Sequence, residues 1–119
     1  RFGDSGGIDS GSTDYTNQLI IQESGGTSYN AVSSSNASSM TLVAGNAPSI
    51  ISFQAFLHGV GSGFEPSIHG KCIYKSTGYK STLFTGWRKA AMTLDRVQFF
   101  FLSGNVTSGR FTVWGISHA

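Results

Sequence analysis

Histidine and cysteine are the residue types here that most readily bind metals or act as nucleophiles, and the chain holds three histidines and one cysteine. A zinc site needs three or four converging ligands, whereas His58 and His69 lie on different expected strands and His118 lies next to the C-terminus. His58 and His69 could still meet across neighbouring strands. Cys72 is alone, which excludes an intrachain disulfide. In its apolar segment it fits a small buried hydrophobic group, with a reactive thiol as the alternative.

Carboxylates and serines form no recognisable catalytic arrangement. A glycosidase needs two carboxylates several ångström apart, and nothing in the spacing of Glu23, Glu65 and Asp95 pairs them. The chain has no G-x-S-x-G nucleophile elbow, and its glycines precede no expected helix that could hold a phosphate. These observations predict a protein that is not an enzyme and needs no metal or cofactor.

Residues 3–14 contain three regularly spaced aspartates among glycines and serines. The spacing of Asp4, Asp9 and Asp14 suggests a calcium loop, but the tight D-x-D-x-D-G pattern with a closing Glu is missing. Asp and Ser side chains also favour turns beside glycine. Solvated turn residues are therefore the preferred interpretation, and a calcium loop is the alternative.

Charge is divided unevenly along the chain. Residues 1–65 hold one basic residue against five acidic ones, which gives −4, and residues 66–119 hold seven against one, which gives +6; the sum is the net charge of +2. A basic half is typical of proteins that bind nucleic acid or an anionic glycan, but it also fits pairing of the two halves within the fold or between subunits. Nucleic-acid binding is the less favoured interpretation, because Lys and Arg stems commonly cover the aromatic residues of a sheet.

The residues expected to contact a glycan or another partner combine aromatic, basic and amide side chains, and they are Phe64, Lys71, Lys75, Lys80, Trp87, Arg88 and Asn105. Three loops could present such a surface: residues 33–39, 59–65 and 103–109. Phe64 stands alone on a glycine-rich loop. Its ring could stack on a ligand, but closure of the end of the core is the preferred interpretation.

Alternating apolar and polar residues, separated by turn signals, predict strands rather than helices. The clearest runs are residues 15–23, 49–60, 67–75 and 79–87, with shorter strands expected at 27–32 and 40–43 and a polar loop at 33–39. About eight short strands in 119 residues predict one all-β domain, a sandwich or a barrel. Charged residues make up 12% of the chain, about half the usual share, and no run of about 18 apolar residues predicts membrane insertion.

Residues 97–116 are expected to form the central hairpin of the fold. Val97, Phe99 and Phe101 alternate with their neighbours, as do Phe111 and Val113, and two glycines with Asn105 fall between the runs. Both predicted arms are apolar on both faces, which is typical of strands inside a packed structure.

The same stretch carries a family resemblance. It reads FFF, SGN, SG, F and GI at residues 99–101, 103–105, 108–109, 111 and 115–116; upstream come Asp14-Tyr15, residues 68–74 (IHGKCIY), Tyr79-Lys80 and residues 86–88 (GWR). In this order the segments resemble a C-terminal β-sandwich domain of tailed-bacteriophage virion proteins, found in tail fibres, spikes and head-decoration proteins. The resemblance covers most of the chain. In that family a strand usually precedes the Gly/Ser/Asp tract, so the chain is expected to be the C-terminal part of a longer virion protein.

The resemblance implies a jelly-roll-like sandwich and a non-enzymatic virion component that attaches to a host-surface glycan. It also implies a homo-oligomer, a trimer above all, which contacts other virion proteins and is assembled in the bacterial cytoplasm. Phe56, Phe100 and Trp114 are the expected subunit contacts, unless the facing sheet buries them. Two alternatives remain, a purely architectural decoration or neck protein and a secreted carbohydrate-binding module.

Overall fold

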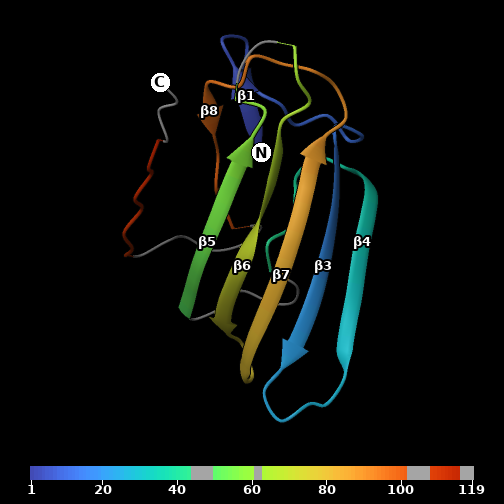
Figure 1. Cartoon of the computed structure of the whole chain (residues 1–119), viewed down its shortest axis with the longest axis vertical. Helices are drawn as coiled ribbons and strands as arrows, with labels where there is room; N and C mark the ends of the chain where they lie inside the picture. Colours follow the sequence, from blue (N-terminus) through green and yellow to red (C-terminus); the bar gives the residue numbers. More distant parts are fainter. Residues whose placement is uncertain (44–49, 61–62, 102–107, 116–119) are drawn as a thin grey trace.

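The computed structural model describes residues 1–43, 50–60, 63–101 and 108–115, and these residues form an all-β fold of two antiparallel sheets (Figure 1). Eight strands occur among them: β1 (Phe2–Asp4), β2 (Gly7–Ile8), β3 (Tyr15–Glu23), β4 (Tyr29–Ala37), β5 (Ile50–His58), β6 (Ser67–Lys75), β7 (Tyr79–Arg88) and β8 (Arg96–Val97). The large sheet has the order β4-β3-β7-β6-β5, and the small sheet has the order β2-β1-β8. The predicted all-β, sandwich-like class with about eight strands is confirmed.

Period-2 alternation places one side of the large sheet in the core. On β3, Tyr15, Leu19 and Ile21 are buried, while Gln18 and Ile20 on the opposite side are exposed. Successive residues of a strand point to opposite faces, so the same alternation continues across β7 and β6. We call the buried side the inner face and the opposite side the outer face.

The inner face is covered by segments from the small sheet and from the connection that follows β4. Phe2 of β1 is fully buried, and Met92 and Leu94, which precede β8, belong to the same core. Met40 lies against Gly86 of β7, where an added Cβ would come within 2.8 Å of the methionine sulfur. The core therefore lies between the large sheet and the small sheet with its flanking segments.

Four of the predicted strands are found close to the expected positions. Residues 15–23 and 67–75 have the predicted bounds as β3 and β6, and the predictions at 49–60 and 79–87 correspond to β5 and β7. The short strand predicted at 27–32 is confirmed for its larger part, since β4 begins at Tyr29, but the polar loop predicted at 33–39 is wrong, because β4 continues to Ala37. Residues 40–43 form no strand; Met40 and Leu42 pack on the core from an irregular segment.

The predicted central hairpin at residues 97–116 is also wrong in the parts that the structure describes. Only Arg96–Val97 form a strand there, and residues 98–101 and 108–115 are irregular. Phe99 and Phe111 place their rings 5.2 Å and 5.4 Å from that of Phe53 on the inner face of β5. Apolar alternation indicates a tendency to form strands, but a strand also needs a neighbouring edge, and these residues pack through ring contacts instead. The connector at 102–107 lies outside the described residues.

Thr82 offers a test of polar burial in this core. The residue is 1% exposed, and within the described part of the chain its Oγ1 has no hydrogen-bond partner. A buried hydroxyl without a partner destabilises the folded state. Thr82→Val keeps the shape and is expected to raise the free energy of unfolding by about 1 kcal/mol, measured by urea denaturation. Thr85→Val, on the outer face, is the control and is expected to change it by less than about 0.5 kcal/mol; a clear loss at Thr82 would contradict the prediction.

Candidate binding face

The outer face of the large sheet is left uncovered by the described residues (Figure 1). It carries apolar side chains among polar ones. Leu83 is 59% exposed, Ile73 56%, and Ile20 and Phe56 48% each. The strand register brings these side chains close together on the sheet. Leu83 of β7 lies directly opposite Ile20 of β3 on one side and opposite Lys71 of β6 on the other. The centre of the outer face consists of Gln18, Ile20, Gln54, Phe56, His69, Lys71, Ile73, Leu83 and Thr85.

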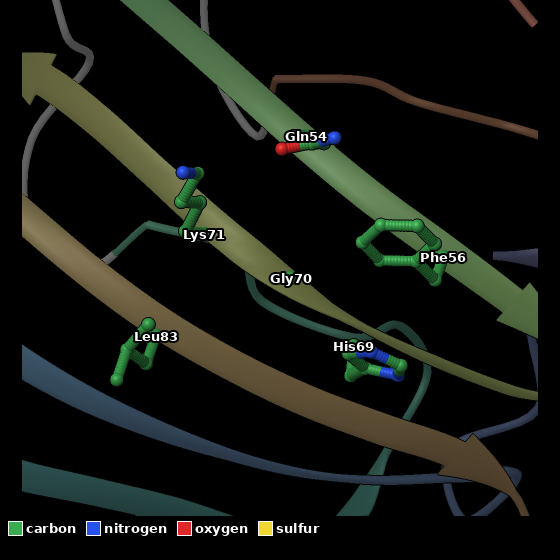
Figure 2. A pocket seen from close by; sticks show the side chains of 6 residues that line it. All are labelled: Gln54, Phe56, His69, Gly70, Lys71 and Leu83. Atoms are coloured by element: carbon green, nitrogen blue, oxygen red, sulfur yellow. The ribbon is translucent and has the colours of Figure 1, made fainter.

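Two shallow depressions lie side by side on this face. The larger, of about 300 Å³, is lined by Gln54, Phe56, His69, Gly70, Lys71 and Leu83 (Figure 2). The smaller, of about 150 Å³, lies over β3 and β7 and shares Leu83 with the first. Figure 2 shows the Phe56 and His69 rings at one end of the larger depression and Lys71 at the other, with the Gln54 amide across from Lys71. The depression thus offers aromatic surface, an amide and a cation together.

The imidazole of His69 links Phe56 to His58 across β5 and β6. Its ring centroid lies 5.3 Å from that of Phe56 in a stacked geometry, and its Nδ1 is 3.0 Å from His58 Nε2. The possibility that the two histidines meet is therefore confirmed. No group of three His, Cys, Asp or Glu residues that could hold a metal occurs in the described ranges, and His118 lies outside them. The histidine pair mainly fixes the orientation of the aromatic end of the depression.

The charge of this face is positive. Lys71 and Lys75 lie on outer positions of β6, and Trp87 lies on an outer position of β7. Lys75 Nζ lies 5.6 Å from the centre of the Tyr79 ring. At the strand positions of this face that the structure describes there is no Asp or Glu. Three predicted partner-contact residues, Lys71, Lys75 and Trp87, are thus brought to one surface.

Two other predicted contact residues are occupied within the fold. Lys80 lies opposite buried Tyr74, on the inner side, and donates a hydrogen bond to Glu23 at 2.5 Å, which raises the pKa of the lysine. Arg88 donates to an Asp9 carboxylate oxygen and also to two backbone carbonyls just beyond β7, at 2.5 and 3.2 Å. Both cations serve ion pairs, so neither belongs to the outer-face surface.

The remaining predicted contact residues lie away from this face or beyond the described chain. Phe64 is 65% exposed, which rules out that it closes the core, and its carbonyl accepts a hydrogen bond from Met92 N at 3.1 Å. Asn105 lies outside the described residues, as does most of the 103–109 loop. Of the other two expected loops, 33–39 is largely the strand β4, and 59–65 is described only in part.

The three predicted subunit contacts are all at least partly exposed. Phe56 is on the outer face, Phe100 is 37% exposed with the Arg1 guanidinium 4.5 Å from its ring centre, and Trp114 is 85% exposed. Burial by the facing sheet therefore does not account for Phe56 or Trp114.

The aspartates and the cysteine act as structural groups. Asp4 accepts a hydrogen bond from Gly6 N at 2.8 Å, and Asp14 accepts one from Gly11 N at 2.6 Å. These are turn contacts, as the preferred interpretation predicted. Cys72 is 1% exposed, and burial raises the pKa of its thiol to about 11. It is a buried hydrophobic residue rather than a nucleophile.

Sequence reasoning did not find the aliphatic half of the binding face. Ile20, Ile73 and Leu83 are apolar residues at positions where alternation along their strands predicts outward side chains. The sequence did contain a signal for this surface: several predicted strands carry apolar residues also at the positions that face solvent. Among the described residues, no helix is long and apolar enough to cross a membrane.

Comparisons with protein-family models, with curated proteins and with solved structures find no match to this chain.

Proposed function

We propose that this chain is a non-enzymatic structural module exposed on the surface of a bacteriophage or phage-like particle, where its outer face binds a glycan of the host surface. The sequence resemblance supports the virion assignment. The uncovered five-stranded face supports the binding role, and it is the observation that carries this proposal. A tail fibre or spike module fits both the virion assignment and the binding role.

The chemistry of the outer face suits a sugar. Pyranose rings present apolar C–H surfaces that pack on aromatic side chains, and Phe56 offers such a ring at 48% exposure. Sugar hydroxyls need donors and acceptors, which the Gln54 and Gln18 amides supply. Lys71 and Lys75 lie on a face whose described strand positions carry no carboxylate, which favours an anionic glycan such as lipopolysaccharide or capsule.

Several copies on one particle turn weak single contacts into firm attachment, because each further contact forms at a high effective concentration. The partners are therefore other copies of this chain, other virion proteins and the host glycan. The particle is assembled in the bacterial cytoplasm.

Phe56→Ala tests the face directly. On an array of bacterial lipopolysaccharides and capsular polysaccharides, the unmodified chain is expected to bind at least one glycan. Phe56→Ala is expected to weaken that binding about tenfold, or about 1.4 kcal/mol, because it removes the stacking ring. Phe64→Ala removes an aromatic ring of similar exposure from a loop and is expected to leave affinity within about twofold. The opposite order would place the site on the loop, and absence of binding in a folded, multivalent sample would overturn the attachment role.

A second candidate is a purely architectural protein that stabilises the particle. The exposed aliphatic side chains of Ile20, Ile73 and Leu83 favour it, since apolar patches of this kind also mark contacts between proteins. This function predicts no glycan binding and instead predicts protection of the outer face in the assembled particle. A secreted carbohydrate-binding module, the third possibility, would bind glycan as a monomer.

A further inference from the structure

Strand β5 ends the large sheet, and among the described residues one of its backbone edges has no neighbouring strand. It pairs with β6 along all nine residues without a register shift, and the described residues provide no strand on its other side. Alternate residues of an antiparallel edge strand point their N–H and C=O groups outward. A row of unpaired backbone donors and acceptors is a template for another strand.

The edge of β5 lacks the features that natural proteins use to block such pairing. Its sequence, IISFQAFLH, contains no lysine, no proline and no bulge, whereas free edges usually carry at least one of these. The opposite edge strand, β4, is rich in serine and pairs with β3 through an irregular register near Tyr15. Of the two edges of the large sheet, β5 is the one suited to accept a strand.

The chain also contains a segment with strand-forming residues that pairs with no strand among the described residues. Residues 110–114, RFTVW, combine two β-branched residues with two aromatic ones, which favours a strand, yet in the structure they are irregular. Val113 is 78% exposed and Trp114 85%. Within the described ranges, no backbone hydrogen bond joins residues 108–115 to β5.

We propose that the free edge of β5 accepts residues 110–114 of a second copy of this chain as an added strand. The added strand would satisfy the outward backbone groups of β5 and cover Val113 and Trp114. The segment already lies on the β5 side of the large sheet (Figure 1), where Phe111 is 5.4 Å from Phe53 between ring centres. Strand addition to a sheet edge is an established mode of recognition, in which main-chain hydrogen bonds give most of the affinity.

The partner is a copy rather than the same chain because the segment's own anchor holds it over the inner face. Phe111 packs against both Phe53 and Phe99, with centroid distances of 5.4 and 4.7 Å, which holds its backbone off the edge. Each copy offers one edge and one segment, so two copies can exchange segments reciprocally, or each copy can pass its segment to the next. Repeated heterologous contacts close into a ring when the rotation permits it.

Proline substitutions test the added strand. Proline removes the backbone N–H and is excluded from paired strand interiors. Since only alternate N–H groups face the neighbour, Thr112→Pro and Val113→Pro are made separately. By light scattering, the unmodified chain is expected to have the mass of two or more copies, and at least one proline variant the mass of one. Thr112→Ala and Val113→Ala keep the N–H groups and are expected to remain assembled.

Two further measurements distinguish the added strand from damage to the fold and from pairing between two β5 edges. Far-UV circular dichroism and the urea midpoint of the proline variants under monomeric conditions should match those of the unmodified chain, because residues 108–115 form no strand within one copy. Ser52→Lys places a charge on the β5 edge and is expected to dissociate the assembly as well. A monomeric unmodified chain would overturn the proposal. So would proline variants that stay assembled while Ser52→Lys dissociates, since β5 would then pair with β5 of another copy.

Discussion

Gly70→Ala is expected to destabilise the fold by about 3 kcal/mol or more, a large part of the roughly 5–15 kcal/mol that typically stabilises a domain. A Cβ at this position would lie 2.1 Å from the Gln54 carbonyl oxygen, 2.9 Å from Ala55 Cα and 2.8 Å from Phe84 Cζ. Two of these atoms belong to the backbone of β5 and cannot rotate away. β5 and β6 would have to separate locally, beneath the larger depression of the outer face. Urea denaturation followed by circular dichroism measures the loss.

Gly115→Ala is the matched control for this substitution. No atom lies within 4 Å of the Cβ that it would add, and its φ is outside the left-handed region. Its free energy of unfolding is expected to change by less than about 0.5 kcal/mol. Equal stability of the two variants would mean that β6 does not approach β5 as closely at Gly70 as the structure shows.

Much of the large sheet could be predicted because its strands combine regular alternation with clear turn signals. In β3 and β6 the apolar residues recur at every second position, and glycine or proline stands close to both ends. The hydrophobic pattern alone then determines which side faces the core. The placement of Phe56 on an outer face followed from the same alternation in β5.

The second part of β4, residues 33–37, could not be predicted because its own residues give little sign of a strand. The segment YNAVSSSNA is mostly polar, and its strand conformation depends on pairing with β3. Strand preference depends strongly on context, so a serine-rich segment beside a strong strand becomes a strand. The error at residues 97–116 is the reverse, since in the part that the structure describes a strong local pattern beyond Val97 packs through ring contacts and pairs with no strand of its own copy.

The predicted contact residues lie on two different faces of the sheet because of the register of the β6–β7 hairpin. This register cannot be read from the amino-acid composition. Lys75 lies opposite Tyr79 across the β6–β7 turn, so Lys80 falls on the side of Tyr74 and pairs with Glu23. A register shift of one residue would have placed Lys80 on the outer face. Lys71 and Lys75 therefore lie on the outer face, where we propose binding, while Lys80 and Arg88 form ion pairs within the fold.

The proposed binding face and the proposed assembly edge share the strand β5. β5 contributes Phe56 and Gln54 to the outer face and its free edge to the proposed contact between copies. Strand addition at that edge would therefore hold the outer faces of neighbouring copies in a fixed arrangement, as multivalent attachment requires. Loss of assembly should weaken attachment to a glycan-coated surface more than binding of one glycan in solution.

Tyr15 links stability to pH through the same hydroxyl that anchors the N-terminal strands. Burial, with the nearby Asp9 and Asp14 carboxylates, raises the pKa of the phenol above its usual value of 10.0. The folded state therefore holds this proton more tightly than the unfolded state does. Its contribution to stability is present below about pH 10 and is lost as the pH rises through the higher folded-state pKa.

Tyr15→Phe is expected to lower the free energy of unfolding by about 1–3 kcal/mol near neutral pH. The Tyr15 hydroxyl accepts a hydrogen bond from Phe2 N at 2.9 Å and donates toward the carbonyls of Asp9 and Phe2 at 3.0 and 3.2 Å. Phenylalanine fills the same space but leaves these buried backbone groups unpaired, so the contact between β1 and the large sheet weakens.

Tyr29→Phe, at a tyrosine that is 66% exposed, is the matched control and is expected to change the free energy of unfolding by less than about 0.5 kcal/mol. Urea denaturation at about pH 7 and about pH 10.5 separates the two effects of Tyr15. The difference between Tyr15→Phe and the unmodified chain should shrink at the higher pH, because ionisation also removes the proton that the hydroxyl donates. If Tyr15→Phe were as stable as the unmodified chain near neutral pH, the N-terminal strands would not be held by this hydroxyl.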